Sequence, residues 1–389
     1  MNLIFFSGYN DRADYYTSQL IAAAEDAHIS YYTVDYNNLS TFTSSVLTDY
    51  IASGDCAAVI FDDIGLMLND ENNSNFWASH QIPVYSFLLS YPIGSPSYLL
   101  SPPAELHLLI PDQSWESNMQ KRFPCIKNYL FLPCGGTFEP VDNTCSALVS
   151  YADRSIDVLC IEDCEQIHDE NSPSYTFLKN NGQDLIQYCI AQQIAEANRS
   201  TESIIQAYFH AENETCTLEQ MEQVLHELTP IVSQTARRYL QQETIRQLDQ
   251  AGLAVEVYGS FWESPDYIYS DHIHLHPSIS RKDANRLTGQ SKISIHFMPD
   301  YLQGADARFF EILANGAVCI ATTNEYTKRR FKDGTHMVNF DKTNPNQLVA
   351  DIRYLLTHES VAEKIANKGC AQATRDTWRQ RLNRLMELI

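Results

Sequence analysis

The sequence predicts an α/β protein made of two tandem Rossmann-like domains, with a helical insertion in the C-terminal half. Three observations predict this fold. Short apolar runs alternate with amphipathic helical stretches, which is typical of parallel sheets covered by helices. The chain has 389 residues, more than one hydrophobic core usually serves. A long polar stretch with helical periodicity interrupts the second half, at about residues 172–249.

The first domain is expected to span residues 1–150. Its apolar runs predict strands at 3–6, 29–34, 57–61, 83–89, 106–110 and 129–132, with an amphipathic helix at 13–27. Each run ends in a polar or glycine-containing turn, and the first of these turns contains Gly8. Ligands gather at the carboxyl ends of the strands in open parallel sheets. We therefore expect these turns to line the ligand cleft.

The second domain is expected to span residues 151–375. A strand at 156–161 precedes the insertion, and further strands follow at 254–258, 273–275, 293–297, 317–321 and 337–340. The tail, 345–389, has the pattern of three helices. The last of them, at 376–389, could pack back on the first domain.

Composition narrows the classes of partner. Apolar residues make up 44% and charged residues 20% of the chain, as in globular proteins. The formal net charge of -22 argues against nucleic acid as a partner. No apolar run reaches the length of a transmembrane segment, and the start lacks the basic region of a signal peptide. We expect a cytoplasmic protein, and the sequence does not indicate its oligomeric state.

The segment 304–316 carries the clearest chemistry. Asp306 suits a helix N-cap and Gly316 a helix stop, so a short helix follows a loop that contains Gly304. Its N-terminus and Arg308 would attract a diphosphate. Glu311, on the same face as Arg308, could accept hydrogen bonds from both hydroxyls of a ribose. The alternative is an ordinary Arg–Glu pair on a surface helix.

Residues 308–317, Arg-Phe-Phe-Glu-Ile-Leu-Ala-Asn-Gly-Ala, resemble the Arg-x-Phe-Glu-x-x-Ala-x-Gly signature of GT-B glycosyltransferases. They look most like the group related to the spore maturation protein CgeB. Residues 257–262, Val-Tyr-Gly-Ser-Phe-Trp, are similar to that group's strand ending in Tyr-Gly-x-x-Trp. Three more segments resemble the strand before the signature, the Phe-Asp-Gly turn after it and the final helix of the group, namely 291–296, 331–336 and 377–381.

The resemblance implies the GT-B fold and transfer of a sugar from a nucleotide donor, UDP-linked, to a hydroxyl on a protein or soluble glycan. Such an enzyme needs no metal or cofactor, because Arg308 and the helix start stabilise the leaving diphosphate. Glu311 would bind the donor ribose. The other residues that the resemblance or the pattern places at the donor are Gly304, Asp306, Tyr258, Gly259, Ser260 and Gly8.

Two positions depart from the family pattern. Gln303 stands where retaining enzymes often carry a second glutamate, which leaves the stereochemical outcome open. Glu162 and Asp163 stand where relatives have a glycine-containing turn, and two carboxylates would repel a diphosphate. These departures keep two alternatives open: a catalytically inactive binding or scaffold protein, and a sugar-nucleotide epimerase or hydrolase.

A catalytic base, if the enzyme inverts, is expected just past a strand of the first domain. Asp11 is preferred because it follows Gly8, where the backbone can approach a ligand closely, although it could instead cap the helix that follows. Asp62, Asp63 and Asp112 are the other candidates.

Three histidines alternate along one predicted strand and could bind zinc. We consider a structural role more consistent with a metal-independent transferase. The three are His272, His274 and His276.

Overall fold

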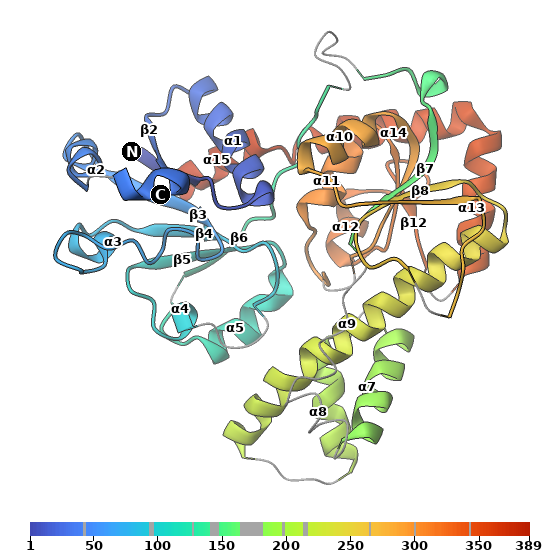
Figure 1. The fold of residues 1–389 in the computed structure, drawn as a ribbon, viewed down its shortest axis with the longest axis horizontal. Helices are drawn as coiled ribbons and strands as arrows, with labels where there is room; N and C mark the ends of the chain where they lie inside the picture. Colours follow the sequence, from blue (N-terminus) through green and yellow to red (C-terminus); the bar gives the residue numbers. More distant parts are fainter. Residues whose placement is uncertain are drawn as a thin grey trace.

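The computed structural model describes residues 1–41, 44–92, 97–126, 128–140, 148–163, 182–196, 199–212, 217–263, 266–298, 301–341 and 344–389. Two α/β domains lie side by side, and a helical arm projects from the second domain past both sheets (Figure 1). Each domain is built on a parallel sheet of six strands. The predicted fold class is thus confirmed, with one sheet for each half of the strand–helix pattern.

The sheet of the first domain has the strand order β2-β1-β3-β4-β5-β6. Its inner strands are buried on both faces, which is why they appear in the sequence as continuous apolar runs. The strands are β1 (Asn2–Ser7), β2 (Tyr31–Asp35), β3 (Cys56–Phe61), β4 (Val84–Phe87), β5 (Leu106–Ile110) and β6 (Asn128–Phe131). The helices are α1 (Asp11–Asp26), α2 (Ser44–Ile51), α3 (Phe76–Ser79), α4 (Ser97–Leu100) and α5 (Glu116–Arg122).

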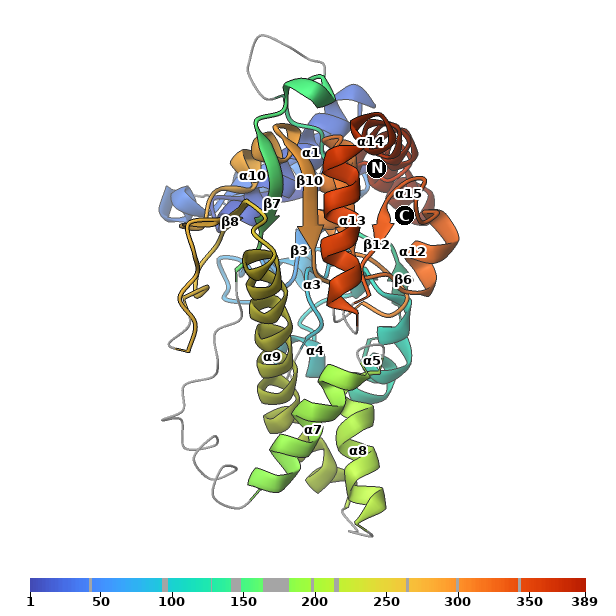
Figure 2. The same cartoon turned by 90° about the vertical axis from the view of Figure 1, so that its right-hand side faces the viewer.

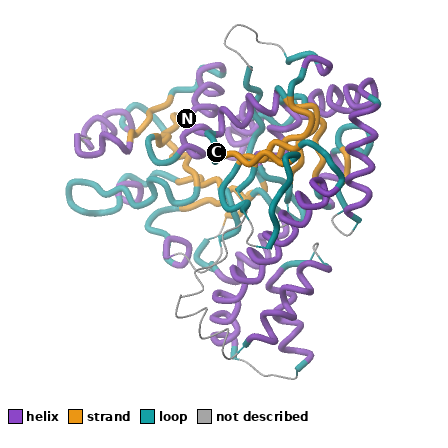
Figure 3. Tube along the Cα trace, turned by 45° about the vertical axis from the view of Figure 1, so that its right-hand side comes forward, coloured by secondary structure: helices purple, strands orange, loops and turns teal. Residues whose placement is uncertain are grey.

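The sheet of the second domain has the order β12-β11-β10-β7-β8-β9. Its first strand in the sequence, β7, therefore lies in the middle, and the later strands lie on both sides of it. Helices surround the strands of both sheets (Figure 3). The strands are β7 (Ile156–Ile161), β8 (Val255–Tyr258), β9 (Ile273–His276), β10 (Ser291–His296), β11 (Val318–Ala321) and β12 (Val338–Asn339). The helices are α10 (Arg281–Gly289), α11 (Ala307–Ala314), α12 (Glu325–Arg330), α13 (Pro345–Thr357) and α14 (Glu359–Ala373).

The helical arm consists of α7 (Gln183–Ala195), α8 (Thr201–Ala211) and α9 (Leu218–Gln250). The first half of α9 packs with α7 and α8 around a small core of its own, which includes Ile205 and Leu228. The second half enters the core of the second domain through Ile245 and Leu248. One long helix therefore fixes the arm to the domain (Figure 2). The predicted insertion begins at 172, and its residues 172–181 lie outside the described part.

The last helix, α15 (Trp378–Leu388), leaves the second domain and packs against α1 of the first. Trp378, Leu382 and Leu385 belong to the hydrophobic core of the first domain. The Trp378 ring lies 5.0 Å from the ring of Tyr16 and 5.6 Å from that of Phe87, measured between centroids. The final segment of the chain thus completes the domain that the chain begins with.

Among the described residues, no helix combines the length and the apolar character needed to cross a membrane. Helix α9 has 33 residues, but polar side chains such as Gln241 and Thr244 recur along it.

Candidate functional site

A cavity of about 250 Å³ lies where the two domains and the helical arm meet. Four arginines line it: Arg12 in the first turn of α1, Arg237 on α9, Arg281 at the start of α10 and Arg308 in the first turn of α11. They come from all three parts of the molecule. Three carboxylates, those of Glu162, Asp163 and Asp306, line the cavity as well, so the arginines leave a small excess of positive charge. In a chain with a formal net charge of -22, this favours an anionic ligand.

Helix α11 begins at the wall of this cavity. Asp306 is its N-cap and accepts a hydrogen bond from the amide of Phe309 at 3.0 Å. Gly316, with a φ of +74°, adopts the left-handed conformation just beyond the end of the helix. The predicted cap and stop are both confirmed. Unpaired amides and the positive end of the helix dipole therefore face the arginines, in an arrangement suited to phosphate.

A buried acid–histidine group faces the same space. The Nε2 atom of His296 contacts the two carboxylate oxygens of Asp306 at 2.9 and 3.0 Å. Its Nδ1 atom lies 4.0 Å from the carboxylate of Glu162. Burial lowers the pKa of His296, but the charge and the hydrogen bond of Asp306, together with the charge of Glu162, outweigh this effect, and the pKa is raised. Burial raises the pKa of Glu162 to about 7.

The turn formed by Glu162 and Asp163, which departs from the family pattern, does face the cavity. The Asp163 carboxylate accepts hydrogen bonds from the Ser260 amide and the Ser278 hydroxyl, both at 2.7 Å. Because the pKa of Glu162 is near 7, this carboxyl is only partly ionised at neutral pH. The repulsion expected between this turn and a diphosphate is therefore smaller than two full charges would produce.

Arg308 and Glu311 lie on one face of α11, as predicted, but they are not on the surface. Arg308 donates to the Asn285 side chain at 3.0 Å and to the Thr288 hydroxyl at 2.6 Å. Glu311 is fully buried, with guanidinium atoms of Arg281 and Arg308 at 3.5 and 3.8 Å. Within the described structure its two carboxylate oxygens make no regular hydrogen bond. An ordinary surface pair is excluded. Glu311 has unused capacity to accept hydrogen bonds, but it is not among the residues that line the cavity.

Asp306 and Arg308 are the sequence-predicted residues that line the cavity. Gly304 lies between the domains instead, where a Cβ atom would come within 2.0 Å of the Pro111 carbonyl oxygen. Gln303 is next to it, and its amide donates to the Asp112 carboxylate at 2.8 Å. Both residues of this loop therefore hold the two domains together.

The remaining predicted donor residues do not line the cavity. Gly259 has a φ of +149° and packs on the Glu162 carbonyl, where a Cβ atom would be 2.2 Å from the oxygen. The backbone amide of Ser260 donates a hydrogen bond to Asp163, and the Tyr258 ring stacks on the His276 ring with 4.2 Å between centroids. Gly8, at the end of β1, has a φ of +81° and packs close to Asn37.

The acids proposed as bases occupy different surroundings. Asp11 accepts a hydrogen bond from the Arg281 amide at 2.8 Å, and the cap of α1 is Asn10, so the capping alternative for Asp11 is wrong. Asp112 is fully buried and bonded to Ser114 as well as Gln303.

Asp62 is half-buried at the end of β3, whereas Asp63 beside it is exposed. Asp62 has a φ of +49°, which is strained for a residue with a side chain. Its carboxylate accepts from the Leu89 amide at 3.0 Å, and burial raises its pKa while the charge of Arg12 opposes that rise. It lines a second cavity, which adjoins the first.

Sequence reasoning missed Arg12, Arg237, Arg281 and His296 as site residues. The first and third lie in the first turns of helices that face each other across the domains. Position in a first turn is a signal that could have found them, since that turn faces the carboxyl end of the preceding strand. Arg237 lies in the middle of a long helix, and the sequence offers no comparable signal for it.

Two of the three alternating histidines contact one carboxylate. Glu256 contacts His274 at 2.6 Å and His276 at 2.5 Å, one ring on each of its oxygens. In the part of the chain that the structure describes, no three His, Cys, Asp or Glu side chains form a group that could hold a metal ion.

Residues 237–387 match the model of a family described as "Glycosyl transferase-like". This segment begins at Arg237 on α9 and contains α10 and α11 with Arg281 and Arg308, so it includes three of the four cavity arginines. No curated protein matches the sequence.

Solved structures resemble the whole chain. A complex of T4 phage BGT with its UDP-glucose substrate has a TM-score of 0.52 at 12% identity, covering 99% of both chains. Sucrose-phosphate synthase from Thermosynechococcus elongatus has a TM-score of 0.51 at 10% identity, covering 100% of this chain and 98% of that one. The chain has the GT-B fold. An alpha-glucosyltransferase in complex with UDP and DNA, with a TM-score of 0.58, 7% identity and coverage of 100% and 98%, shares this GT-B architecture.

Proposed function

We propose that this protein is a glycosyltransferase that moves a sugar from a UDP-linked donor to a hydroxyl acceptor. The convergence of four arginines on the start of α11 carries the proposal, because it provides a diphosphate site between the domains. The glycosyltransferase-like family match covers this part of the chain. Structures with the same fold are described with UDP or UDP-glucose. The motif similarities favour the group related to CgeB.

The diphosphate would bind between Arg308 and the N-terminal amides of α11. The ribose hydroxyls would donate to Glu311, whose oxygens lack regular hydrogen bonds within the described structure. This requires the Arg281 side chain, 3.5 Å from Glu311, to turn toward the phosphates. Gly259, Ser260 and Tyr258 would border the rest of the nucleotide. No metal is needed for charge neutralisation, since the arginines supply it.

We propose Asp62 as the catalytic base, in preference to Asp11. Asp62 lines a cavity and has a raised pKa, whereas the Asp11 carboxylate is bonded to the Arg281 amide. The acceptor oxygen would form a bond to the anomeric carbon as its proton passes to Asp62. The bond from that carbon to the diphosphate would break, and UDP would leave with the electron pair. Such a single displacement inverts the anomeric centre.

Isothermal titration with UDP tests the donor site. The parent should bind UDP, and Glu311→Gln should weaken binding by about tenfold to a hundredfold, as the loss of one or two hydrogen bonds to a charged group predicts. Glu325→Gln, at an exposed carboxylate on α12, is the matched control and should bind like the parent. Thermal unfolding without ligand shows whether each variant is folded. A parent that binds neither UDP nor UDP-glucose contradicts the proposal.

The two alternatives make different predictions for turnover. A hydrolase or epimerase would consume UDP-glucose at full rate without any acceptor. An inactive binding protein would bind UDP and turn over no sugar nucleotide with any acceptor. A transferase should release UDP slowly alone and faster when its acceptor is added.

The pH dependence of UDP binding should show the effect of the negative charge of Glu162. Below its pKa of about 7 the carboxyl is neutral, and above it the charge opposes the diphosphate. Parent and Glu162→Gln should therefore bind UDP equally at pH 6, while the parent should bind roughly tenfold more weakly at pH 8, about 1.4 kcal/mol. The quantity to follow is the ratio of the Kd of the parent to the Kd of Glu162→Gln. Ionisation of the UDP phosphates affects both Kd values equally and cancels in this ratio. A ratio that stays constant from pH 6 to pH 8 would rule out this role.

A further inference from the structure

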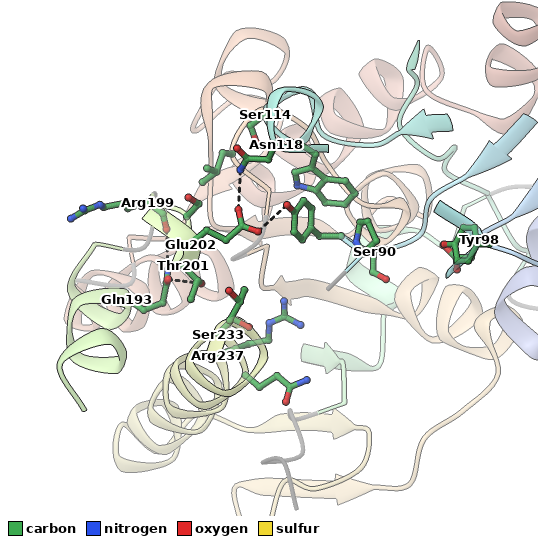
Figure 4. A pocket seen from close by; sticks show the side chains of 18 residues that line it. Ser90, Tyr98, Ser114, Asn118, Gln193, Arg199, Thr201, Glu202, Ser233 and Arg237 are labelled. Carbon is green, nitrogen blue, oxygen red and sulfur yellow. Dashed lines mark hydrogen bonds between the residues drawn. The ribbon is translucent and has the colours of Figure 1, made fainter. Parts of the chain in front are cut away.

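A second cavity, of about 570 Å³, separates the helical arm from the first domain. One wall comes from the loop after β4, from α4 and α5, and from the short 3-10 helix Gln113–Trp115 after β5. The opposite wall comes from α7, from the start of α8 and from the middle of α9. Figure 4 shows Ser233 and Arg237 extending from α9 toward this space, while Arg199 points away from it. The arm thus forms one of the two walls of this site.

Glu202 holds the arm in place. Its carboxylate accepts from the Tyr91 hydroxyl and from the Asn118 amide, each at 2.9 Å, and lies 3.5 Å from the Arg122 guanidinium. All three partners belong to the first domain, and the Glu202 side chain is only 13% exposed. This contact links the two walls of the cavity (Figure 4).

The lining combines polar side chains with a substantial apolar surface and carries little net charge. Glu202 is paired with Arg122, and Arg199 points away from the cavity and pairs with Glu196. Arg237 and Asp62 are the other two charged residues of the lining, and their charges are opposite. Most of the other side chains are hydroxyls or amides, which can both donate and accept hydrogen bonds. The aromatic rings of Tyr91 and Trp115 also line the cavity, 5.3 Å apart between centroids. Rings next to such groups match a sugar, which has apolar C–H faces and a rim of hydroxyls.

The second cavity adjoins the arginine-lined one. Ser90, Tyr91, Trp115 and Arg237 line both. Asp62 lies in the second cavity, yet the charge of Arg12, a residue of the first, acts on its pKa. A ligand in the second cavity can therefore present a hydroxyl to Asp62 and to a sugar held in the first.

We propose that the second cavity is the acceptor site and that the acceptor is the end of a short neutral oligosaccharide, bound between the arm and the first domain. This inference rests on the proposed transferase function. The volume lies within the roughly 300–1,000 Å³ of small-molecule sites, whereas a folded protein acceptor would need about 800 Å² of contact surface. The balanced charge of the lining and the net charge of -22 disfavour a nucleic acid or another polyanion.

The test uses the full chain, saturated with UDP, and saturation-transfer NMR with maltotriose, cellotriose, laminaritriose and chitotriose. A serine-containing hexapeptide and a DNA 13-mer are the competing probes. At least one trisaccharide should bind, and Ser233→Trp, which fills the cavity from α9, should reduce its binding more than tenfold. Gln223→Trp, an exposed position on the same helix, is the matched control. UDP affinity should be unchanged in both variants.

The outcomes separate this inference from the proposed function. If UDP binds but no trisaccharide does, or if only the peptide or the DNA binds, the oligosaccharide site is wrong and the donor site stands. If Ser233→Trp binds the trisaccharide like the parent, the ligand lies elsewhere and the inference fails. If UDP itself does not bind, the transferase proposal fails first. Saccharide binding that Ser233→Trp abolishes and Gln223→Trp preserves supports the acceptor site.

Discussion

Replacing Asp62 by asparagine should lower the turnover of sugar transfer by about 10²- to 10⁴-fold, the usual contribution of a general base. The Leu89 amide can still donate to the new side-chain oxygen, so the strained turn at the end of β3 should persist. Folding should not suffer, because a carboxyl with a raised pKa destabilises the folded state once it is ionised. The measurement is the initial rate of UDP release with saturating donor and acceptor.

Asp63→Asn is the matched control, since Asp63 is the next residue and is exposed. It should retain activity within about twofold of the parent, with unchanged UDP affinity in both variants. In the parent the rate should fall as pH drops through the raised pKa of Asp62, because the base must be ionised to accept the acceptor proton. Sugar transfer by Asp62→Asn at the parental rate would rule out Asp62 as the base and would favour Asp11 instead.

Replacing Trp378 by alanine should destabilise the first domain by about 3–5 kcal/mol, as for other large aromatic side chains removed from a core. The ring is 2% exposed and packs on Tyr16, Phe61 and Phe87. Urea unfolding followed by circular dichroism measures the change. Because Trp378 follows the whole second domain in the sequence, the loss tests whether the end of the chain is part of the first folding unit.

Asn383→Ala is the control on the same helix, at an exposed position, and should change the free energy of unfolding by less than about 0.5 kcal/mol. If Trp378→Ala unfolds at the same urea concentration as the parent, α15 contributes little to the first domain. UDP binding at low temperature should survive in Trp378→Ala, because Trp378 does not line the arginine cavity.

The elements of both sheets could be predicted because they depend on local sequence. A parallel strand buried on both faces is a short apolar run, and each of the twelve strands in the described part of the chain overlaps a predicted one. Helix α11 is defined by its own ends, since Asp306 can cap it and Gly316 can adopt a positive φ. The sequence of that segment by itself therefore predicts a helix N-terminus suited to a diphosphate, without any information on contacts between the domains.

Only the tertiary structure decided which side chains meet. Arg12, Arg237, Arg281 and Arg308 are far apart in sequence and converge because α1, α9, α10 and α11 all reach one cavity. The burial of Glu311 depends on Arg281, and the raised pKa of Glu162 depends on its enclosure beside His296. Asp62 is preferred over Asp11 as the catalytic base because of surroundings that only the folded chain creates. Local patterns determine elements, whereas the distance and desolvation that govern a site come from segments packed against each other across the fold.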